Sequence, residues 1–229
     1  MKYHIKNNLG GLHLEKGIEI NVKEKIDNKK FQFFIKRLFD ILLSFIGIVI
    51  LIPVYIVIAI AIKLDSKGPI IFKQIRVGKN GKKFTIYKFR TMIASAESKR
   101  KLQMDPKNMD KFIFQSKSDN RITRVGKFLR NSSLDEIPQL FNVLLGNMSL
   151  VGPRPEIPEV VEYYPKEYYQ RLLVLPGITG LAQISGRGEI ELGRTIFYDL
   201  TYINNFSIGF DIKILINTVF KVFKKEGAF

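Results

Sequence analysis

The stretch "ILLSFIGIVILIPVYIVIAIAI", residues 41–62, contains no charged side chain. Its length of about 22 residues is enough to cross the hydrocarbon core of a bilayer. It begins too far from the N-terminus, and lacks the small-residue cleavage site, to be a secretory signal peptide. A buried helix of a soluble protein is the alternative, but such helices usually carry a polar face. The stretch therefore predicts a membrane helix.

Two features of this segment bear on its topology. Basic residues flank it on both sides: Lys29, Lys30, Lys36 and Arg37 before it, and Lys63, Lys67 and Lys73 after it. Such residues prefer the cytoplasmic side of a membrane. Pro53 lies near the middle, where it removes a backbone donor and bends a helix. These features favour a re-entrant helix that returns to its own face over a spanning one, provided that protein groups satisfy the freed backbone.

The composition limits the chemistry of the rest of the chain. The 229 residues suggest one main domain. Lys and Arg number 37 against 21 Asp and Glu, so an anionic partner is expected: nucleic acid, an acidic membrane surface or a phosphorylated substrate. There is no cysteine, and the two histidines are His4 and His13. Disulfides and thiolate metal sites are excluded, and a Ser-His triad or His-ligated zinc is disfavoured.

Local patterns predict an α+β fold that is mainly helical. Residues 70–77 and 83–92 flank Asn80-Gly81, a strong signal for a β-hairpin. Helices are expected over residues 138–145, after Pro165, and over residues 211–225. The last of these is basic and amphipathic, and it could either lie in the membrane interface or pack against the domain. Residues 1–30 resemble a loosely attached N-terminal arm. The charged residues 94–120 fit either a surface helix pair or a mobile excursion.

Two neighbouring acids, Asp135 and Glu136, stand between a pair of serines and an apolar run. Ser133 and Glu136 fit a helix capping box. Pro138 opposes this interpretation, because with Ser133 as the cap it would be the fifth helical residue, where its missing donor matters. If Pro138 instead lies close to the first helical position, the acids precede the helix and are free for another task. Both interpretations stay open on composition alone.

The acid pair and its surroundings suit phosphoryl chemistry. An ionised Asp135 is a competent nucleophile on phosphorus, and Glu136 could hold a Mg²⁺ that offsets phosphate charge. Lys88 and Arg90 are two apart on a predicted strand, so their side chains share a face. Arg154 stands between Pro153 and Pro155 and presents a fork matched to phosphate oxygens. The glycine-rich residues 176–188 are a weak signal for a nucleotide-binding loop.

Five stretches together resemble a known family. They are "KRLFD", "IYKFRTM", "SLDEIPQLFNVLLGNMSLVGPRP", "PGITGLAQISGR" and "YDLTYINNFSIGFDIKIL", and they cover nearly all of residues 36–223. In this order they are similar to the monotopic polyprenyl-phosphate phosphoglycosyl transferases, the bacterial sugar transferases that initiate surface-glycan assembly such as exopolysaccharide, capsule and O-antigen. The resemblance implies transfer of a sugar-1-phosphate from a UDP-sugar to a polyprenyl phosphate, typically undecaprenyl phosphate, with release of UMP.

The resemblance also assigns roles to residues. It implies a covalent phosphosugar on Asp135 and a Mg²⁺ at Glu136. The basic positions around the phosphates would be Lys88, Arg90, Arg130 and Arg154. The loop near the nucleotide-sugar would contribute Gly177, Thr179, Gly180, Gln183 and Arg187. Neither the transferred sugar nor the oligomeric state can be read from the sequence.

The family's membrane segment is re-entrant, with both ends cytoplasmic and a Ser-Pro break. Here Ile52 replaces the serine before Pro53. The expected organisation is an N-terminal arm (1–30), a re-entrant membrane helix region (31–67) and a cytoplasmic catalytic domain with interfacial helices (68–229). This places the protein, as a minimal member, at the bacterial inner membrane with its active site on the cytoplasmic face, near downstream glycosyltransferases. A membrane-anchored, non-catalytic binding or scaffold protein for anionic lipid or nucleic acid is the alternative; the absence of a recognisable nucleic-acid module and the intact acid pair oppose it.

Overall fold

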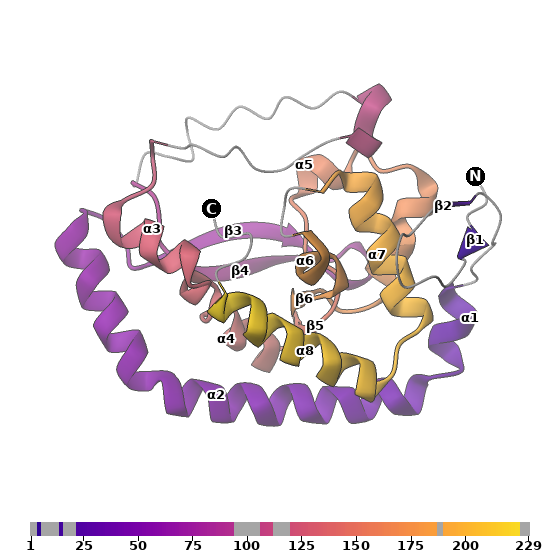
Figure 1. The fold of residues 1–229 in the computed structure, drawn as a ribbon, viewed down its shortest axis with the longest axis horizontal. Helices are drawn as coiled ribbons and strands as arrows, with labels where there is room; N and C mark the ends of the chain where they lie inside the picture. The colour runs from indigo at the N-terminus through magenta and orange to yellow at the C-terminus, as the bar shows by residue number, and fades with distance from the viewer. Residues whose placement is uncertain are drawn as a thin grey trace.

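The computed structural model describes residues 4–5, 14–15, 22–93, 106–111, 120–186 and 190–224. Over these residues the fold is mainly helical, with two-stranded sheets and one long helix that runs beside the rest (Figure 1). The prediction of a mainly helical α+β fold with a small hairpin is therefore confirmed.

The helices are α1 (Val22–Asp27), α2 (Lys30–Asp65), α3 (Arg124–Asn131), α4 (Gln139–Leu144), α5 (Pro158–Val161), α6 (Leu181–Gly186), α7 (Leu192–Asn204) and α8 (Ile208–Phe223). The strands are β1 (His4–Ile5), β2 (Leu14–Glu15), β3 (Ile71–Val77), β4 (Lys83–Phe89), β5 (Ser149–Val151) and β6 (Gly177–Thr179). Short 3₁₀ turns are η1 (Lys79–Gly81), η3 (Pro106–Lys111), η4 (Leu134–Glu136) and η5 (Lys166–Leu173).

The helix α2 is the longest element and contains the apolar stretch. Its 36 residues continue through Pro53, and at 1.5 Å per residue the path along the helix axis is about 54 Å long. Figure 1 shows α2 following the lower edge of the domain and turning upward at its left end. Only 11% of its most apolar window is buried. Within the described residues it is the one helix long and apolar enough to cross a membrane.

The first half of α2 is fixed to the domain by buried polar contacts. Lys36 Nζ donates to Asp211 Oδ2 of α8 at 2.5 Å, and Tyr202 donates to the other oxygen of the same carboxylate at 2.8 Å. Asp40 accepts a hydrogen bond from the backbone N–H of Leu150 at 3.0 Å. All these side chains except that of Leu150 are buried. Since an unpaired buried charge is costly, these contacts hold the helix in one place.

The second half of α2 packs against the same domain. The hydroxyl of Tyr55 donates to the carbonyl of Ile137 at 2.7 Å, and Asp65 accepts from the backbone N–H of Val125 at 3.0 Å. Between these contacts lies a buried apolar cluster formed by Ile58, Ile62, Phe89 and Leu129. Both halves of α2 therefore rest on one folded unit.

The predicted hairpin is confirmed. Strands β3 and β4 pair antiparallel, with Ile71 opposite Phe89 and Val77 opposite Lys83. The turn between them contains Asn80 at φ 56° and Gly81 at φ 75°, the left-handed conformations that these two residue types tolerate best. The hairpin places Lys88 near its base, beside the turn that carries the acid pair.

Strands β5 and β6 pair in parallel, and glycines allow their backbones to approach. A Cβ on Gly177 would lie 2.1 Å from the nitrogen of Gly152, and one on Gly180 would lie 2.2 Å from the oxygen of Gly152. The "PGITG" glycines are thus explained by close backbone packing, whether or not the loop also meets a ligand.

Several predicted elements differ in detail. The helix α4 ends as expected, with Gly146 at φ 83°, but the segment after Pro165 is the 3₁₀ turn η5 rather than an α-helix. The end of the expected N-terminal arm is helical, and Val22 of α1 is buried against α7. Of residues 94–120, only η3 and Asn120 are described, so the rest of that prediction lies outside the described residues.

The C-terminal helix α8 begins three residues earlier than expected. Ser207 caps it by accepting a hydrogen bond from the N–H of Phe210 at 3.1 Å. Ile214 is buried in the core, whereas other apolar side chains are exposed: Ile212, Ile216, Val219 and Phe220. The helix therefore carries apolar residues on both its core face and its outer face.

The close approach of β5 and β6 can be tested with Gly177→Ala. The added methyl group meets backbone atoms that cannot move independently, so we expect a loss of about 2–3 kcal/mol in the free energy of unfolding, measured by denaturant or thermal melting in detergent. Gly209→Ala is the matched control: nothing lies within 4 Å of its added Cβ, and it lies in α8. That change should stabilise the protein by about 0.5–1 kcal/mol. Equal effects of the two changes would contradict the packing argument.

Candidate active site

The acid pair lies in the short turn η4, before α4 begins at Gln139. Ser133 has φ 55° and its side chain caps nothing, so the capping-box interpretation is wrong. The reason is Pro138, which lies immediately before the first residue of α4 and leaves the acids outside that helix. Neither carboxylate is therefore occupied in capping a helix.

Glu136 holds together two cations from different parts of the chain. Its Oε1 lies 2.6 Å from Nζ of Lys88 on β4 and 3.1 Å from Nη1 of Arg154, which follows β5. Burial alone would raise the pKa of Glu136, but the charges and hydrogen bonds of Lys88 and Arg154 outweigh it and lower the pKa to about 2. Glu136 is thus ionised throughout the physiological range.

For Asp135 the effect of burial on the pKa outweighs that of the nearby cations. Burial raises its pKa to about 6, and the neighbouring Glu136 charge adds to the rise, while Lys88 and more weakly Arg130 and Arg154 oppose it. At neutral pH the carboxylate is still mainly ionised, yet it is more basic than an ordinary aspartate. A basic, ionised carboxylate that takes no part in the ion pairs of Glu136 is suited to act as a nucleophile or base.

The predicted basic residues divide into two groups. Lys88, Arg154 and Arg130 surround the acid pair; the Nε of Arg130 also donates to Thr91 Oγ1 at 2.9 Å. Arg90 instead binds the end of α2, donating to the carbonyls of Ser66 and Lys67 at 2.7 Å each. In this structure its guanidinium supports the end of α2, and its role at a phosphate stays a prediction.

The glycine-rich loop presents fewer groups than its sequence suggested. Thr179 shares a hydrogen bond with Thr218 of α8 at 2.7 Å. The amide oxygen and nitrogen of Gln183 are buried without a partner in the described part of the chain. Gly177 and Gly180 serve backbone packing, and Arg187 lies outside the described residues. A role for this loop at the nucleotide-sugar remains a prediction.

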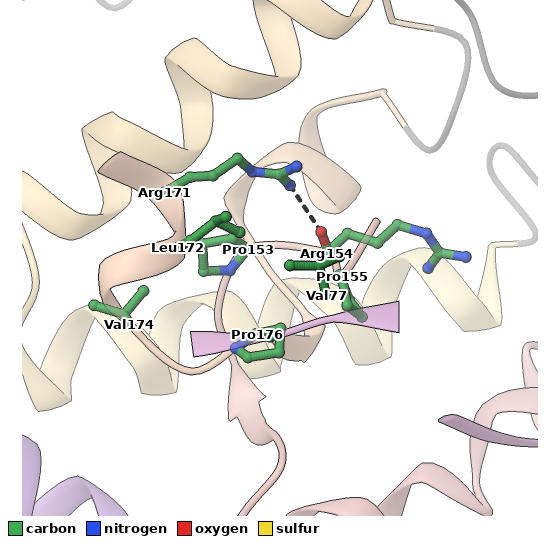
Figure 2. Close-up of a pocket in the computed structure, with 9 residues that line it drawn as sticks. Val77, Pro153, Arg154, Pro155, Arg171, Leu172, Val174 and Pro176 are labelled. Atoms are coloured by element: carbon green, nitrogen blue, oxygen red, sulfur yellow. Dashed lines mark hydrogen bonds between the residues drawn. The ribbon is translucent and has the colours of Figure 1, made fainter. Parts of the chain in front are cut away.

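Sequence reasoning missed Arg171, which lies directly behind Arg154. Its side chain is 1% exposed, and its Nη2 donates to the Arg154 carbonyl at 2.8 Å (Figure 2). Figure 2 also shows the small pocket lined in part by Pro153, Pro155 and Pro176 around this contact. The one available signal was an arginine inside the apolar run "RLLVL", where a charge needs a buried partner.

The residues present permit a divalent cation only with help from a substrate. Among the described residues, no group of three or more His, Cys, Asp and Glu side chains could hold a metal. Both cationic contacts of Glu136 fall on Oε1, so Oε2 lies outside these ion pairs. Mg²⁺ is commonly held by one or two carboxylates together with substrate phosphates, and the acid pair fits that pattern.

Comparison with known proteins places this site in context. The sequence model of a family described as bacterial sugar transferase matches residues 31–225. A UDP-glucose:undecaprenyl-phosphate glucose-1-phosphate transferase of Klebsiella pneumoniae is 46% identical, with 85% of this chain and 41% of that protein covered. An undecaprenyl-phosphate galactose phosphotransferase of Salmonella typhimurium is 40% identical, over 88% of this chain and 43% of that protein. The galactosyl transferase CpsE of Streptococcus agalactiae is 44% identical, over 84% of this chain and 43% of that protein. The chain thus spans about two fifths of the length of these curated relatives.

The contrasting pKa values predict opposite stability effects for the two acids. The pKa of Asp135 in the folded protein, about 6, exceeds its ordinary value of 3.8, so its ionised form lowers stability above pH 6. Asp135→Asn should therefore stabilise the protein by on the order of 1–3 kcal/mol at pH 8, and the gain should shrink as the pH falls to 5.

Glu136→Gln provides the matched comparison for that measurement. The pKa of Glu136 is lowered, so its stabilising effect is complete above the ordinary value of 4.5 and is lost only as the pH falls toward 2. We expect a loss of unfolding free energy that is constant between pH 7 and pH 8, where Asp135 is mainly ionised in both proteins. Denaturant melts of both variants from pH 5 to pH 8 measure these effects, and destabilisation by Asp135→Asn at pH 8 would contradict the assignment.

Proposed function

The chain belongs to the bacterial sugar transferase family, and we therefore propose that it is an enzyme that transfers a sugar-1-phosphate from a UDP-sugar to undecaprenyl phosphate. The names of its relatives describe this class of reaction, with glucose or galactose as the sugar. The observation that carries the proposal is the pair Asp135 and Glu136 set among Lys88, Arg130 and Arg154. Three cations facing two carboxylates leave a positive site for phosphate groups.

The proposed reaction has two steps. A carboxylate oxygen of Asp135 attacks the phosphorus that carries the sugar, the bond to the bridging oxygen breaks, and UMP leaves with that oxygen. An oxygen of the polyprenyl phosphate then attacks the same phosphorus and displaces Asp135, which regenerates the carboxylate and forms the lipid diphosphate sugar. Arg154 and Lys88 would bind the phosphate oxygens, since guanidinium and ammonium groups match them.

We also propose a role for Mg²⁺ in the first step. Glu136 Oε2, with the donor diphosphate, would hold the ion, which would offset the charge of the phosphates. The same argument explains why Glu136 needs to remain ionised. Lys88 and Arg154 lower the pKa of Glu136 despite its burial, and this low pKa keeps the carboxylate ionised.

The placement of α2 supports a monotopic, re-entrant attachment to the inner membrane. A helix of about 54 Å that crossed a hydrocarbon core of about 30 Å would separate its two ends. Here the ends bind Asp211 and Val125 of one domain. The outward side chains along the helix are apolar and exposed, among them Phe34, Phe45, Ile50, Val57 and Leu64. We propose that this surface, with the outer face of α8, enters the cytoplasmic leaflet and turns at Pro53.

The covalent step predicts an isolable adduct. Purified protein incubated with Mg²⁺ and a panel of UDP-sugars, without lipid acceptor, should release one UMP per active site and gain a phosphosugar on Asp135, detected by peptide mass spectrometry. Asp135→Asn should abolish both signals. Asp27→Asn, which changes an exposed carboxylate on α1, should leave them unchanged. Full turnover by Asp135→Asn would exclude this residue as the nucleophile.

The topology predicts a labelling pattern in membranes. The chain contains no cysteine, so single-cysteine variants report one site each. Lys30→Cys and Lys79→Cys, before and after the apolar segment, should both react with a membrane-impermeant maleimide in inside-out vesicles and not in spheroplasts. Ile50→Cys, 68% exposed on α2, should react only after detergent is added. Labelling of Lys30→Cys and Lys79→Cys from opposite sides would show a spanning helix instead.

A further inference from the structure

The backbone that carries Arg154 is held at four consecutive carbonyls. The donors are Gly177 N to Pro153 O at 2.9 Å, Arg171 Nη2 to Arg154 O at 2.8 Å, Arg76 Nη1 to Pro155 O at 3.1 Å, and Val77 N to Glu156 O at 2.8 Å. Pro153 and Pro155 have no N–H to donate, so the carbonyls are the groups through which this part of the segment is fixed. Two of the four donors are side chains of buried or largely buried arginines.

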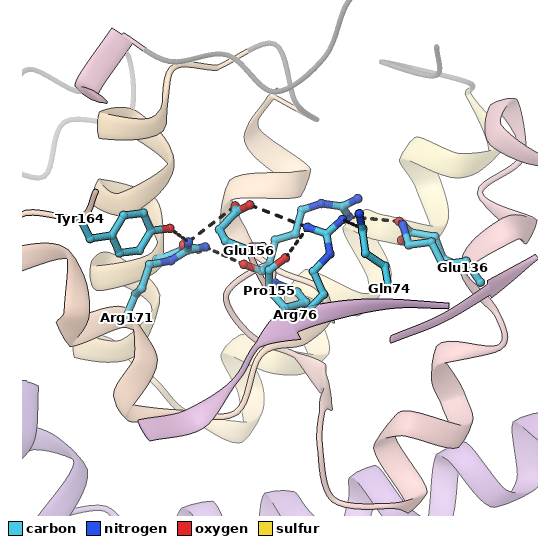
Figure 3. A network of polar contacts seen from close by, with 10 residues as sticks. Gln74, Arg76, Glu136, Pro155, Glu156, Tyr164 and Arg171 are labelled. Atoms are coloured by element: carbon cyan, nitrogen blue, oxygen red, sulfur yellow. Dashed lines mark hydrogen bonds and ion pairs between the residues drawn. The ribbon is translucent and has the colours of Figure 1, made fainter. Parts of the chain in front are cut away.

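These two arginines reach the segment from opposite sides. Arg171 comes from η5 and Arg76 from β3, and the carboxylate of Glu156 lies between them (Figure 3). Glu156 Oε1 is 3.6 Å from Arg171 Nη1, and Oε2 is 4.0 Å from Arg76 Nη1. The side chain of Glu156 is 4% exposed, so it supplies a buried negative charge to both. We call Arg76, Glu156 and Arg171 the backbone clasp.

The clasp is itself anchored. Arg171 Nη1 donates to the hydroxyl of Tyr164 at 2.6 Å, and Nη2 lies 2.7 Å from Asp199 of α7. Two arginines thus face two carboxylates in a buried setting, which balances their charges. Asp199 is among the most buried acids described, and burial raises its pKa to about 6 against the opposing charge of Arg171.

The head of Arg154 cannot be positioned by burial, because its side chain is 36% exposed. Prolines fix φ at residues 153 and 155, but they leave ψ free, and ψ decides where each carbonyl points. Gly177 holds the carbonyl of Pro153 and Arg76 holds that of Pro155, which fixes the two rotations that the prolines leave open. Arg171 holds the carbonyl of Arg154 between them, and so fixes ψ of that residue. The side chain that leaves this backbone then meets Glu136 at 3.1 Å.

We propose that Arg76 and Arg171, with Glu156 between them, are positioning residues that aim Arg154 at the acid pair and hence at the donor phosphates. The inference rests on the proposed function for the identity of the substrate. It does not require either arginine to touch that substrate. A displacement of Arg154 by about 1 Å is enough to lower the rate substantially, because catalytic groups act over short distances.

A double-mutant cycle tests the proposal. Arg76→Met and Arg171→Lys are made alone and together with Arg154→Lys, and kcat and KM for UMP release are measured. Each single change should lower kcat roughly tenfold, and neither should lower it further once Arg154 is replaced. Independent losses that multiply in the double variants would overturn the proposal. If Arg171→Lys fails to fold, Arg76→Met decides, since Arg76 is the more exposed of the two.

Arg37→Met is the matched control for the cycle. Arg37 also donates to two backbone carbonyls, those of Leu144 and Met148 at 3.3 Å each, but these lie at the end of α4 and the start of β5. Its loss should affect the rate by the same factor with Arg154 or with Lys at that position. A purely structural role for the clasp would give this same independent behaviour in the Arg76 and Arg171 variants.

A second readout needs no turnover. Phenylglyoxal modifies exposed arginines, and the rate of modification at Arg154 can be followed by peptide mass spectrometry. We expect it to rise several-fold in Arg76→Met and Arg171→Lys and to stay unchanged in Arg37→Met. An unchanged rate in both clasp variants would refute the positioning role even for a protein that turned over no UDP-sugar. Failure of the proposed function would instead appear as absent UMP release by the wild type.

Discussion

One carboxylate oxygen joins three distant parts of the chain. Oε1 of Glu136 binds Lys88 from the hairpin and Arg154 from the segment after β5, while Glu136 itself lies in the turn before α4. If this carboxylate were absent, two cations would face each other at close range in a partly buried site, which is unfavourable. The arrangement of hairpin, turn and proline segment therefore depends on Glu136 remaining ionised, and the two cations that it holds are groups proposed to bind phosphate.

The long apolar helix α2 and the acid pair are directly connected. Tyr55 of α2 donates to the carbonyl of Ile137, the residue that follows Glu136. Ile62 of the same helix packs against Phe89, which follows Lys88 on β4. The depth at which α2 lies in a membrane would therefore fix the height of the acid pair above it. The proposed acceptor would have its phosphate at the headgroup level, so this connection would place the proposed nucleophile, Asp135, where that phosphate arrives.

Some of this architecture is readable from the sequence because its causes are local. The turn at Asn80-Gly81 needs left-handed backbone, which those residues supply, and the charge-free run of α2 needs no context to be recognised. The rest depends on tertiary structure. Lys88 and Arg90 were predicted to share a strand face, but β4 ends at Phe89. Arg90 binds carbonyls at the end of α2, while Lys88 binds Glu136. Arg171 has a role only because Asp199 and the Arg154 carbonyl lie beside it, and sequence spacing reveals neither.

The two neighbouring acids show how adjacent residues can take separate roles. Both are partly buried carboxylates facing the same cations, but Glu136 accepts both direct ion pairs and Asp135 accepts neither of them. The ion pairs lower the pKa of Glu136 to about 2, whereas burial and the Glu136 charge raise that of Asp135 to about 6. A carboxylate held by two cations has its electron density committed to them, and it is a weak nucleophile. Its neighbour keeps its basicity while remaining mainly ionised at neutral pH, which is what attack on phosphorus requires. The division of labour proposed for this site, with Asp135 attacking and Glu136 organising charge, follows from the place of the ion pairs rather than from the order of the residues.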